Sequence, residues 1–245
     1  MDNFKDYILD LFFPKFCLGC KKEGSYLCED CRGLLDICEF NYCLCEQGHS
    51  MLPVNSKLGK CNKCNDRKLF GLYFALPYKD NVLTKKLICQ FKYQPYLKDL
   101  ASTLASILIE HFIKTGKNTN EIWVPGGKSA VLVPVPLHFK KMRERGYNQS
   151  EELAKELSKI LQIPVISNNL IKIKSTKAQA ESTKLEREKN LQGAFKIKNP
   201  AEFSGKKIFL VDDVYTTGST MQDCAKILKE NGAKSVWGIC IAREQ

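Results

Sequence analysis

Two adjacent aspartates, Asp212 and Asp213, follow directly on a short apolar run near the C-terminus of this 245-residue chain. The run at 208–211 comes after turn residues and is typical of a strand buried on both faces. Residues 218–231 then carry apolar side chains at helical spacing, and 236–242 is a second apolar run. This order predicts a βαβ unit. The loop after its first strand lies where open parallel sheets bind ligands.

The loop of this unit carries the residue types that bind a sugar phosphate. Hydroxyl side chains and backbone N–H groups at the start of a helix attract an anion, and a glycine lets the backbone approach it closely. These residues, which we call the phosphate loop, are Thr216, Thr217, Gly218, Ser219 and Thr220. The acid pair, Asp212 and Asp213, repels a phosphate but suits vicinal hydroxyls, and a ribose 5-phosphate carries both groups. The alternative is a solvated pair of aspartates followed by a threonine that caps the helix.

The charge and hydropathy of the chain indicate which ligands it binds and whether it enters a membrane. The net charge of +11 favours anionic ligands, phosphates first and nucleic acid second. No apolar run approaches the roughly 18 residues of a membrane helix, and the acidic N-terminus has too short an apolar core for a secretory signal. Phe4, Tyr7 and Leu11 follow helical spacing, which predicts a short amphipathic helix that packs on the protein itself. We therefore expect a cytoplasmic protein without membrane insertion.

The cysteines form close pairs in the first quarter of the chain. Paired thiolates two or three residues apart grip a metal ion from a tight turn, and two such pairs complete a tetrahedron. We predict two structural zinc sites with four cysteine ligands each: one of Cys17, Cys20, Cys28 and Cys31, and one of Cys43, Cys45, Cys61 and Cys64. The segment has few large apolar residues, so zinc is expected to supply much of its folding free energy.

Alternatives to this ligand assignment stay open. Cys43 and Cys45 are separated by a single residue, so Cys38 or His49 could substitute in the second site, and the four pairs could also combine crosswise. A disulfide framework is a further alternative, disfavoured because the chain shows no export signal and its pairs have zinc-knuckle spacing.

Strands alternate with helices through the rest of the chain. The strand-like ranges are 70–78, 130–135 and 170–174, and the helical ranges are 81–91, 96–114 and 149–161. Such alternation predicts an α/β domain with a mostly parallel sheet. We divide the chain into a zinc region, 1–68, and an α/β domain, 69–245.

A polar loop with several basic residues follows the strand at 130–135 and leaves the same end of the predicted sheet. It contains Lys140, Arg143 and Arg145 and is followed by Asn148. A guanidinium fork suits a diphosphate. Taken alone, the cluster is more simply a solvated surface. Together with the acid pair and the phosphate loop, it supplies the parts of a site for 5-phosphoribosyl-1-diphosphate.

The string from the acid pair through the phosphate loop resembles the sequence motif of type I phosphoribosyltransferases, and the whole chain resembles the ComF family. This is a group of zinc-ribbon phosphoribosyltransferase-like proteins linked to competence and DNA uptake. The further matches are Phe13-Pro14, the cysteine pairs, 87–93, 133–136, 145–149 and the later positions Lys177, Gln179, Arg187, Asn190 and 193–195. The chain departs from the family at Cys43-x-Cys45, where Cys-x-x-Cys is usual.

The resemblance implies a fold and further roles. The fold is a type I phosphoribosyltransferase-like, mostly parallel sheet flanked by helices, with a small N-terminal zinc ribbon. Residues 175–192, with Gln179, Arg187 and Asn190, are implied to form the flexible loop that closes over the reaction centre. The segments between 69 and 130, with the ribbon, are candidates for the hood that holds the nucleophile.

Two hypotheses of function follow. In the first, the protein is a phosphoribosyltransferase: Mg2+ bridges diphosphate and ribose hydroxyls, and Asp212 and Asp213 hold the diol. Arg145, with Lys140 and Arg143, neutralises the departing diphosphate, and a nitrogen nucleophile takes C1′.

In the second hypothesis, the protein is a non-catalytic module that senses the sugar diphosphate. Its zinc ribbon and basic surface bind single-stranded DNA or a protein of the competence machinery. Phe16, Tyr26, Phe40 and Tyr42 could stack on bases, although such residues more often pack around zinc knuckles.

Overall fold

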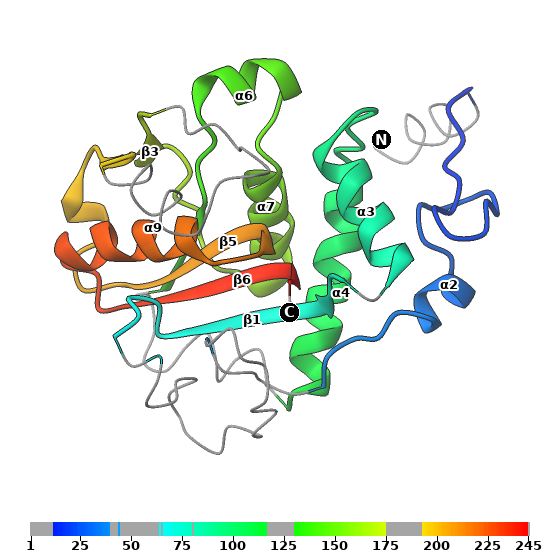
Figure 1. Cartoon of the computed structure of the whole chain (residues 1–245), viewed down its shortest axis with the longest axis horizontal. Coiled ribbons are helices and arrows are strands. Elements are labelled where there is room, and N and C mark those ends of the chain that lie inside the picture. The colour runs from blue at the N-terminus through cyan, green and yellow to red at the C-terminus, as the bar shows by residue number, and fades with distance from the viewer. Residues whose placement is uncertain are drawn as a thin grey trace.

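A parallel four-stranded sheet forms the centre of the molecule (Figure 1). The structure is a computed structural model that describes residues 12–39, 44, 64, 66–79, 81–116, 130–174 and 193–244. The sheet has the strand order β1-β6-β5-β2, and every neighbouring pair is parallel. Its strands are β1 (Gly71–Pro77), β2 (Ala130–Pro134), β5 (Lys207–Tyr215) and β6 (Ser235–Arg243).

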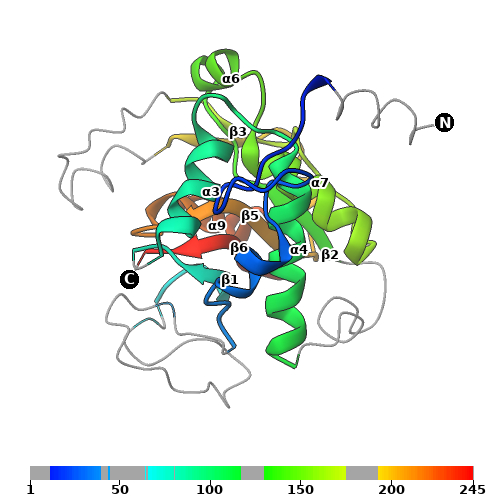
Figure 2. The same cartoon turned by 90° about the vertical axis from the view of Figure 1, so that its right-hand side faces the viewer.

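Both faces of the sheet are covered, which explains why its strands are continuously apolar. Alternate residues of β5 enter separate cores: Phe209 and Val211 join one apolar cluster, and Ile208 and Leu210 join the other. The first cluster packs against α3 (Val82–Lys92), α4 (Leu100–Lys114) and α7 (Gln149–Leu161), which lie side by side in Figure 2. The second packs against α9 (Ser219–Glu230).

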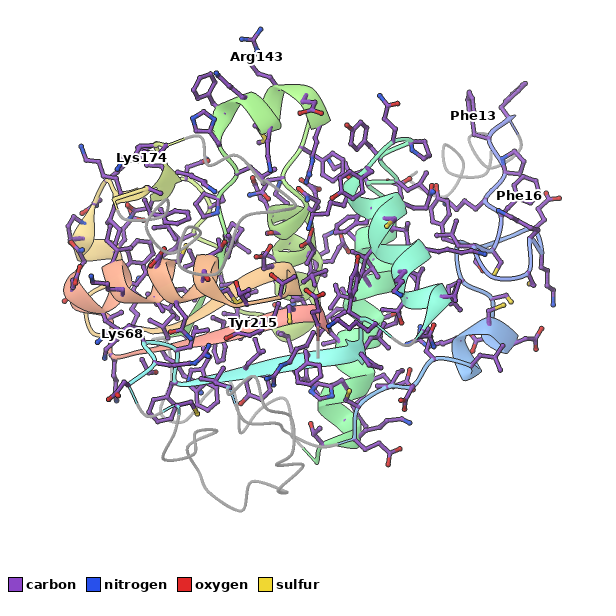
Figure 3. The ribbon with its side chains drawn as sticks, in the orientation of Figure 1. Phe13, Phe16, Lys68, Arg143, Lys174 and Tyr215 are labelled. Carbon is purple, nitrogen blue, oxygen red and sulfur yellow. The ribbon has the colours of Figure 1, made fainter. Side chains whose placement is uncertain are left out.

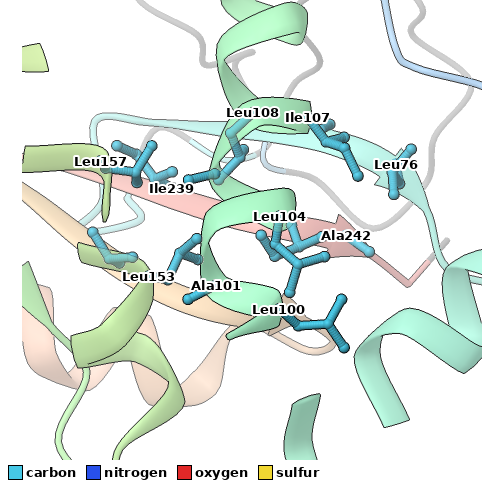
Figure 4. Close-up of a cluster of buried hydrophobic side chains, with 14 of the residues drawn as sticks. Leu76, Leu100, Ala101, Leu104, Ile107, Leu108, Leu153, Leu157, Ile239 and Ala242 are labelled. Carbon is cyan, nitrogen blue, oxygen red and sulfur yellow. The ribbon is translucent and has the colours of Figure 1, made fainter. Parts of the chain in front are cut away.

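Helix α4 is the main cover of one sheet face. Leu100, Leu104 and Leu108, each four residues apart, turn one side of the helix toward the sheet (Figure 4). Side chains with this spacing lie above one another on a helix, so they form the apolar stripe that the sequence predicted. The stripe meets Ile239 and Ala242 of β6 within the same cluster.

The strand predicted near 170–174 exists but lies outside the parallel sheet. β3 (Leu170–Lys172) pairs antiparallel with β4 (Phe195–Ile197), a strand that the sequence did not predict. An isolated bridge between His138 and Lys172 joins this two-stranded sheet to the chain that leaves β2.

The polar loop predicted after β2 contains a short helix, α6 (Phe139–Arg145), so the prediction of a loop was wrong over these residues. The His138 ring accepts a hydrogen bond from the backbone N–H of Lys140 at the helix start. Gly146 ends the helix in the left-handed conformation, with φ of 79°. The helix stands apart from the sheet at the top of Figure 1.

The N-terminal cysteine segment packs on α3 and α4. Its short helix α2 (Glu29–Gly33) carries Arg32, which donates hydrogen bonds to Glu110 at 3.1 Å and Ser106 at 2.9 Å on α4. Apolar residues of the segment share one cluster with the sheet and its helices. The amphipathic helix predicted at the N-terminus lies in 1–11, outside the described residues, and the boundary at residue 68 stays a prediction. Among the described helices, none has the length and apolarity that a membrane crossing requires.

Candidate functional site

The acid pair lies inside β5 near its carboxyl end. The sequence placed the strand at 208–211, but β5 continues to Tyr215 because Asp212 and Val214 pair with Cys240 and Ala242 of β6. Successive strand residues point to opposite faces, so the two carboxylates straddle the end of the sheet.

Asp213 is a buried carboxylate with two side-chain donors. It is 3% exposed, and its Oδ1 accepts a hydrogen bond from Lys92 Nζ at 3.0 Å. Its Oδ2 accepts from Gln149 Nε2 at 3.2 Å. Burial alone would lower the pKa of Lys92, but Asp213 and Asp212 raise it well above its ordinary value, so this lysine is an ammonium ion.

Asp212 accepts hydrogen bonds on one of its oxygens. Its Oδ1 receives the Ser150 hydroxyl at 2.9 Å and the backbone N–H of Asp213 at 2.9 Å. Burial and the charge of Asp213 raise the pKa of Asp212 to about 7, against the opposing effect of Lys92. The acid pair therefore carries less than two full negative charges at neutral pH.

The N-terminus of α7 supports the acid pair. Asn148 accepts a hydrogen bond from Ser150 N at 3.1 Å and donates one to Val135 O at 3.1 Å, which joins the start of α7 to the end of β2. Helix N-termini favour negative charge, so this arrangement stabilises the carboxylates beside it. We predicted Asn148 as a ligand-binding residue, and the structure places it, buried, as the cap that orients Gln149 and Ser150.

The phosphate loop connects β5 to α9 as predicted. Gly218 has φ of 74° and directly precedes the helix. A β-carbon there would lie 2.1 Å from the Tyr215 hydroxyl, so both the backbone angle and the space require glycine. The hydroxyls of Thr217 and Ser219 lie 2.9 Å apart, and Thr216 is exposed. The Ser219 N–H donates to the Thr217 hydroxyl oxygen at 3.4 Å, so the loop presents hydroxyls at a helix start, directly after the strand that carries the acid pair.

The basic residues of helix α6 differ in how far they are buried. Lys141 and Arg145, four residues apart, are half-buried. Burial lowers the pKa of Lys141, and the positive charges of Arg145 and Lys92 lower it further, whereas the negative charge of Asp213 acts in the opposite direction. Lys140 and Arg143 are exposed, and Figure 3 shows Arg143 extending from the outer tip of the helix.

Of the three basic residues that we predicted here, Arg145 is half-buried, whereas Lys140 and Arg143 are exposed. Its guanidinium lies 5.6 Å from the centre of the Tyr93 ring. Its Nη1 is buried and has no hydrogen-bond partner among the described residues, so it retains a donor for an anion.

Four residues of this site were not predicted as site residues from the sequence: Lys92, Lys141, Gln149 and Ser150. A helical spacing of four from Arg145 would have found Lys141. Gln149 and Ser150 follow Asn148 directly, at a predicted helix start. The predicted loop residues Gln179, Arg187 and Asn190 lie outside the described residues, between β3 and β4.

The first predicted zinc site is assembled. The sulfur atoms of Cys17, Cys20, Cys28 and Cys31 all lie within 4.8 Å of one another, a spacing that suits one tetrahedral zinc ion. Burial favours the Cys17 thiol, but backbone N–H groups of Cys28, Cys20 and Gly19 outweigh it and lower the pKa of Cys17 to about 6. The Cys17 side chain and burial raise the pKa of Cys31 to about 12, so a zinc ion must displace the Cys31 proton when it binds.

Most ligands of the second predicted zinc site lie outside the described residues. Cys43, Cys45 and Cys61 lie outside the described residues, whereas Cys64 is buried. Cys38, the alternative ligand, is also buried, and its backbone N–H donates to Ala75 O at 2.8 Å.

Comparison with known proteins agrees with this geometry. The family model described as "Phosphoribosyl transferase domain" matches residues 147–244, from the start of α7 to the end of β6. Competence protein F of Haemophilus influenzae is 31% identical over 247 residues, which cover 94% of this chain and 99% of that protein. The chain belongs to the ComF family. Its α/β fold, with a parallel sheet flanked by helices and an N-terminal cysteine cluster, is the one that we predicted.

Other ComF relatives are also similar. Competence protein ComFC of Bacillus subtilis is 28% identical, over 91% of this chain and 86% of that protein. DNA utilization protein YhgH of Escherichia coli K12 is 32% identical, over 64% of this chain and 66% of that protein. Among solved structures, a hypoxanthine phosphoribosyltransferase of Staphylococcus aureus overlaps 60% of this chain and 64% of its own, with 13% identity and a TM-score of 0.35.

We predict that Gly19→Ala weakens zinc binding, because a β-carbon at residue 19 would lie 2.5 Å from Cys31 Sγ. The expected effect is a loss of about tenfold or more in zinc affinity, measured by competition with a chromogenic chelator. Gly33→Ala is the matched control, since no atom lies within 4 Å of a β-carbon there. Equal zinc affinities of the two variants would contradict the proposed ligand geometry.

We also predict that Asp212 makes the ligand-free protein less stable as pH rises. Its pKa is about 7 when folded and 3.8 in the reference state, so the folded protein binds this proton more tightly. The resulting stabilisation is complete below about pH 4 and is lost as pH rises through about 7. Urea unfolding at about pH 5 and about pH 8 should show a decline that Asp212→Asn reduces by about 1 kcal/mol or more. Asp99→Asn, at an exposed position, should leave the decline unchanged.

Proposed function

We propose that this ComF protein binds 5-phosphoribosyl-1-diphosphate with Mg2+ and transfers the phosphoribosyl group to a nitrogen acceptor. The observation that carries the proposal is the position of the acid pair. It lies on β5 directly before the glycine-containing phosphate loop, and Asp213 interacts electrostatically with the half-buried Lys141 of α6, which in turn interacts with Arg145. The match of residues 147–244 to a phosphoribosyl transferase domain supports it.

Each part of the ligand has a counterpart in the site. The 5-phosphate is assigned to the phosphate loop, where hydroxyls and helix N–H groups favour an anion. The vicinal hydroxyls are assigned to Asp212 and Asp213, whose oxygens accept hydrogen bonds. The diphosphate is assigned to Arg145 and Lys141, because a guanidinium and an ammonium neutralise an anionic leaving group.

The acid pair fits Mg2+ in part. Carboxylate oxygens are preferred Mg2+ ligands, and Asp212 Oδ2 accepts no hydrogen bond from any described residue. Both oxygens of Asp213 already have side-chain donors. When bound, Mg2+ would add positive charge to the diphosphate and so ease its departure.

In the proposed reaction, the charges of the site residues oppose the charges that develop on the ribosyl ring and on the diphosphate. As the bond from C1′ to the diphosphate oxygen breaks, positive charge develops on the ribosyl ring. Asp212 and Asp213 are then placed to stabilise it, while Arg145 and Lys141 take up the charge of the leaving group. The acceptor nitrogen forms the new bond at C1′. The names of the relatives refer to competence and DNA utilization, and we infer the same context, within the cytoplasm, for this chain.

Calorimetric titration of the sugar diphosphate with Mg2+ tests this proposal. Wild type should give saturable heat, and Asp213→Asn should bind about tenfold or more weakly, since it loses a charged acceptor. Asp36→Asn removes the same charge at an exposed position and should bind like wild type. Absence of heat at millimolar ligand, with folded wild type, would remove the proposal. Diphosphate release with a panel of bases and amines identifies the acceptor.

A second candidate function is a module that senses the sugar diphosphate and binds single-stranded DNA or a competence protein. The outer face of α6 favours DNA, because Phe139, 59% exposed, and Met142 lie there among the exposed Lys140 and Arg143. Of the aromatic residues proposed near the ribbon, Phe16 is exposed and Tyr26 packs against the core. Phe40 and Tyr42 lie outside the described residues.

Salt dependence tests the second candidate. Affinity for an oligothymidylate should fall steeply with added salt, and Arg143→Ala should reduce the slope of the logarithmic plot by about one phosphate contact. Lys85→Ala, an exposed lysine on α3, is the control and should leave the slope unchanged. Binding that is insensitive to salt, or that does not occur at low salt, would count against this candidate.

A further inference from the structure

The end of α3 touches three separate parts of the site through three consecutive residues. The Phe91 carbonyl accepts a hydrogen bond from the Tyr147 hydroxyl, which lies between α6 and α7. Lys92 pairs with Asp213 on β5, and the Tyr93 ring lies under the Arg145 guanidinium. The C-terminal end of α3 therefore lies between the acid pair and the basic helix α6.

The ammonium group of Lys92 lies against the acid pair, where a bound cation would lie. Its Nζ is 3.0 Å from Asp213 Oδ1, and its side chain is 28% exposed, whereas that of Asp213 is 5% exposed. Two adjacent carboxylates in low-dielectric surroundings repel each other, and a positive charge beside them offsets this repulsion. Lys92 supplies this charge from within the chain.

We propose that Lys92 is the resident cation of the acid pair and competes with a divalent cation for Asp213. This inference rests on the proposed function, in which the same carboxylates hold a sugar diphosphate and Mg2+. A divalent ion on Asp213 would lie beside the ammonium, and like charges at such a separation repel strongly. The flexible four-carbon side chain of Lys92 reaches partly to solvent, so it can move away from Asp213 without movement of the helix.

The competition makes metal binding conditional on the sugar diphosphate. Without the sugar, Lys92 holds Asp213 and the divalent ion binds weakly. With the sugar present, the diphosphate offers the displaced ammonium a new anionic partner, and the ion can take its place on the carboxylate. Lys92 thus acts as a positioning residue that produces positive coupling between the two ligands.

Binding of Mn2+ in the absence of sugar, followed by electron paramagnetic resonance of the free ion, tests this role. Lys92→Gln should bind Mn2+ about tenfold more tightly than wild type, because the competing charge is gone. Lys86→Gln is the matched control: it removes the same charge from an exposed position on the same helix and should bind Mn2+ like wild type. Lys92→Arg, which keeps the charge, should bind as weakly as wild type.

The outcomes separate this inference from the proposed function. In an Asp213→Asn background, Lys92→Gln should have no further effect on Mn2+ affinity, because the contested carboxylate is absent. Equal Mn2+ affinities of Lys92→Gln and Lys86→Gln would overturn the inference even if wild type binds the sugar diphosphate with Mg2+. Failure of wild type to bind that pair of ligands would instead overturn the proposed function. If Lys92→Gln does not fold, Lys92→Met, which retains the apolar part of the side chain, takes its place.

Discussion

The ion pair between Lys92 and Asp213 joins segments that lie 121 residues apart in the chain. One partner ends α3, and the other lies near the end of the central strand β5. Loss of Lys92 would leave the buried Asp213 carboxylate without its cation, and an uncompensated buried charge is destabilising. The arrangement of α3, α7 and β5 around the site depends on this contact, because Gln149 of α7 binds the other oxygen of the same carboxylate.

The sequence predicted the elements that are specified locally. The apolar run before the acid pair, the helix after Gly218 and the paired cysteines are patterns within a few residues. The structure confirms the βαβ unit and the Cys17–Cys31 cluster. Gly218 was expected because of its backbone freedom, and the nearby Tyr215 hydroxyl adds a steric reason that the sequence did not reveal.

The parts that were not predicted depend on contacts between distant segments. β4 is three residues long and is defined by its pairing with β3, so its own sequence carries little periodicity. The contact of Lys92 with Asp213 forms only when the end of α3 packs beside β5. Arg143 and Arg145 cannot be distinguished in a linear sequence. Residues two positions apart on a helix point to different sides, so Arg143 is exposed and Arg145 is half-buried.

Helix α3 connects the cysteine cluster to the acid pair at the end of the sheet. Near its start, Leu83 lies against the knuckle, 3.6 Å from where a β-carbon of Gly19 would be, and its last residue is Lys92. Its eleven residues span about 16 Å as a single rigid rod. Because Leu87, Ile88 and Phe91 hold the rest of α3 in the core, loss of a metal from the cluster would loosen only the start of the helix, at the end opposite Lys92. The packing of the cysteine segment and the position of Lys92 beside Asp213 are therefore linked through one helix.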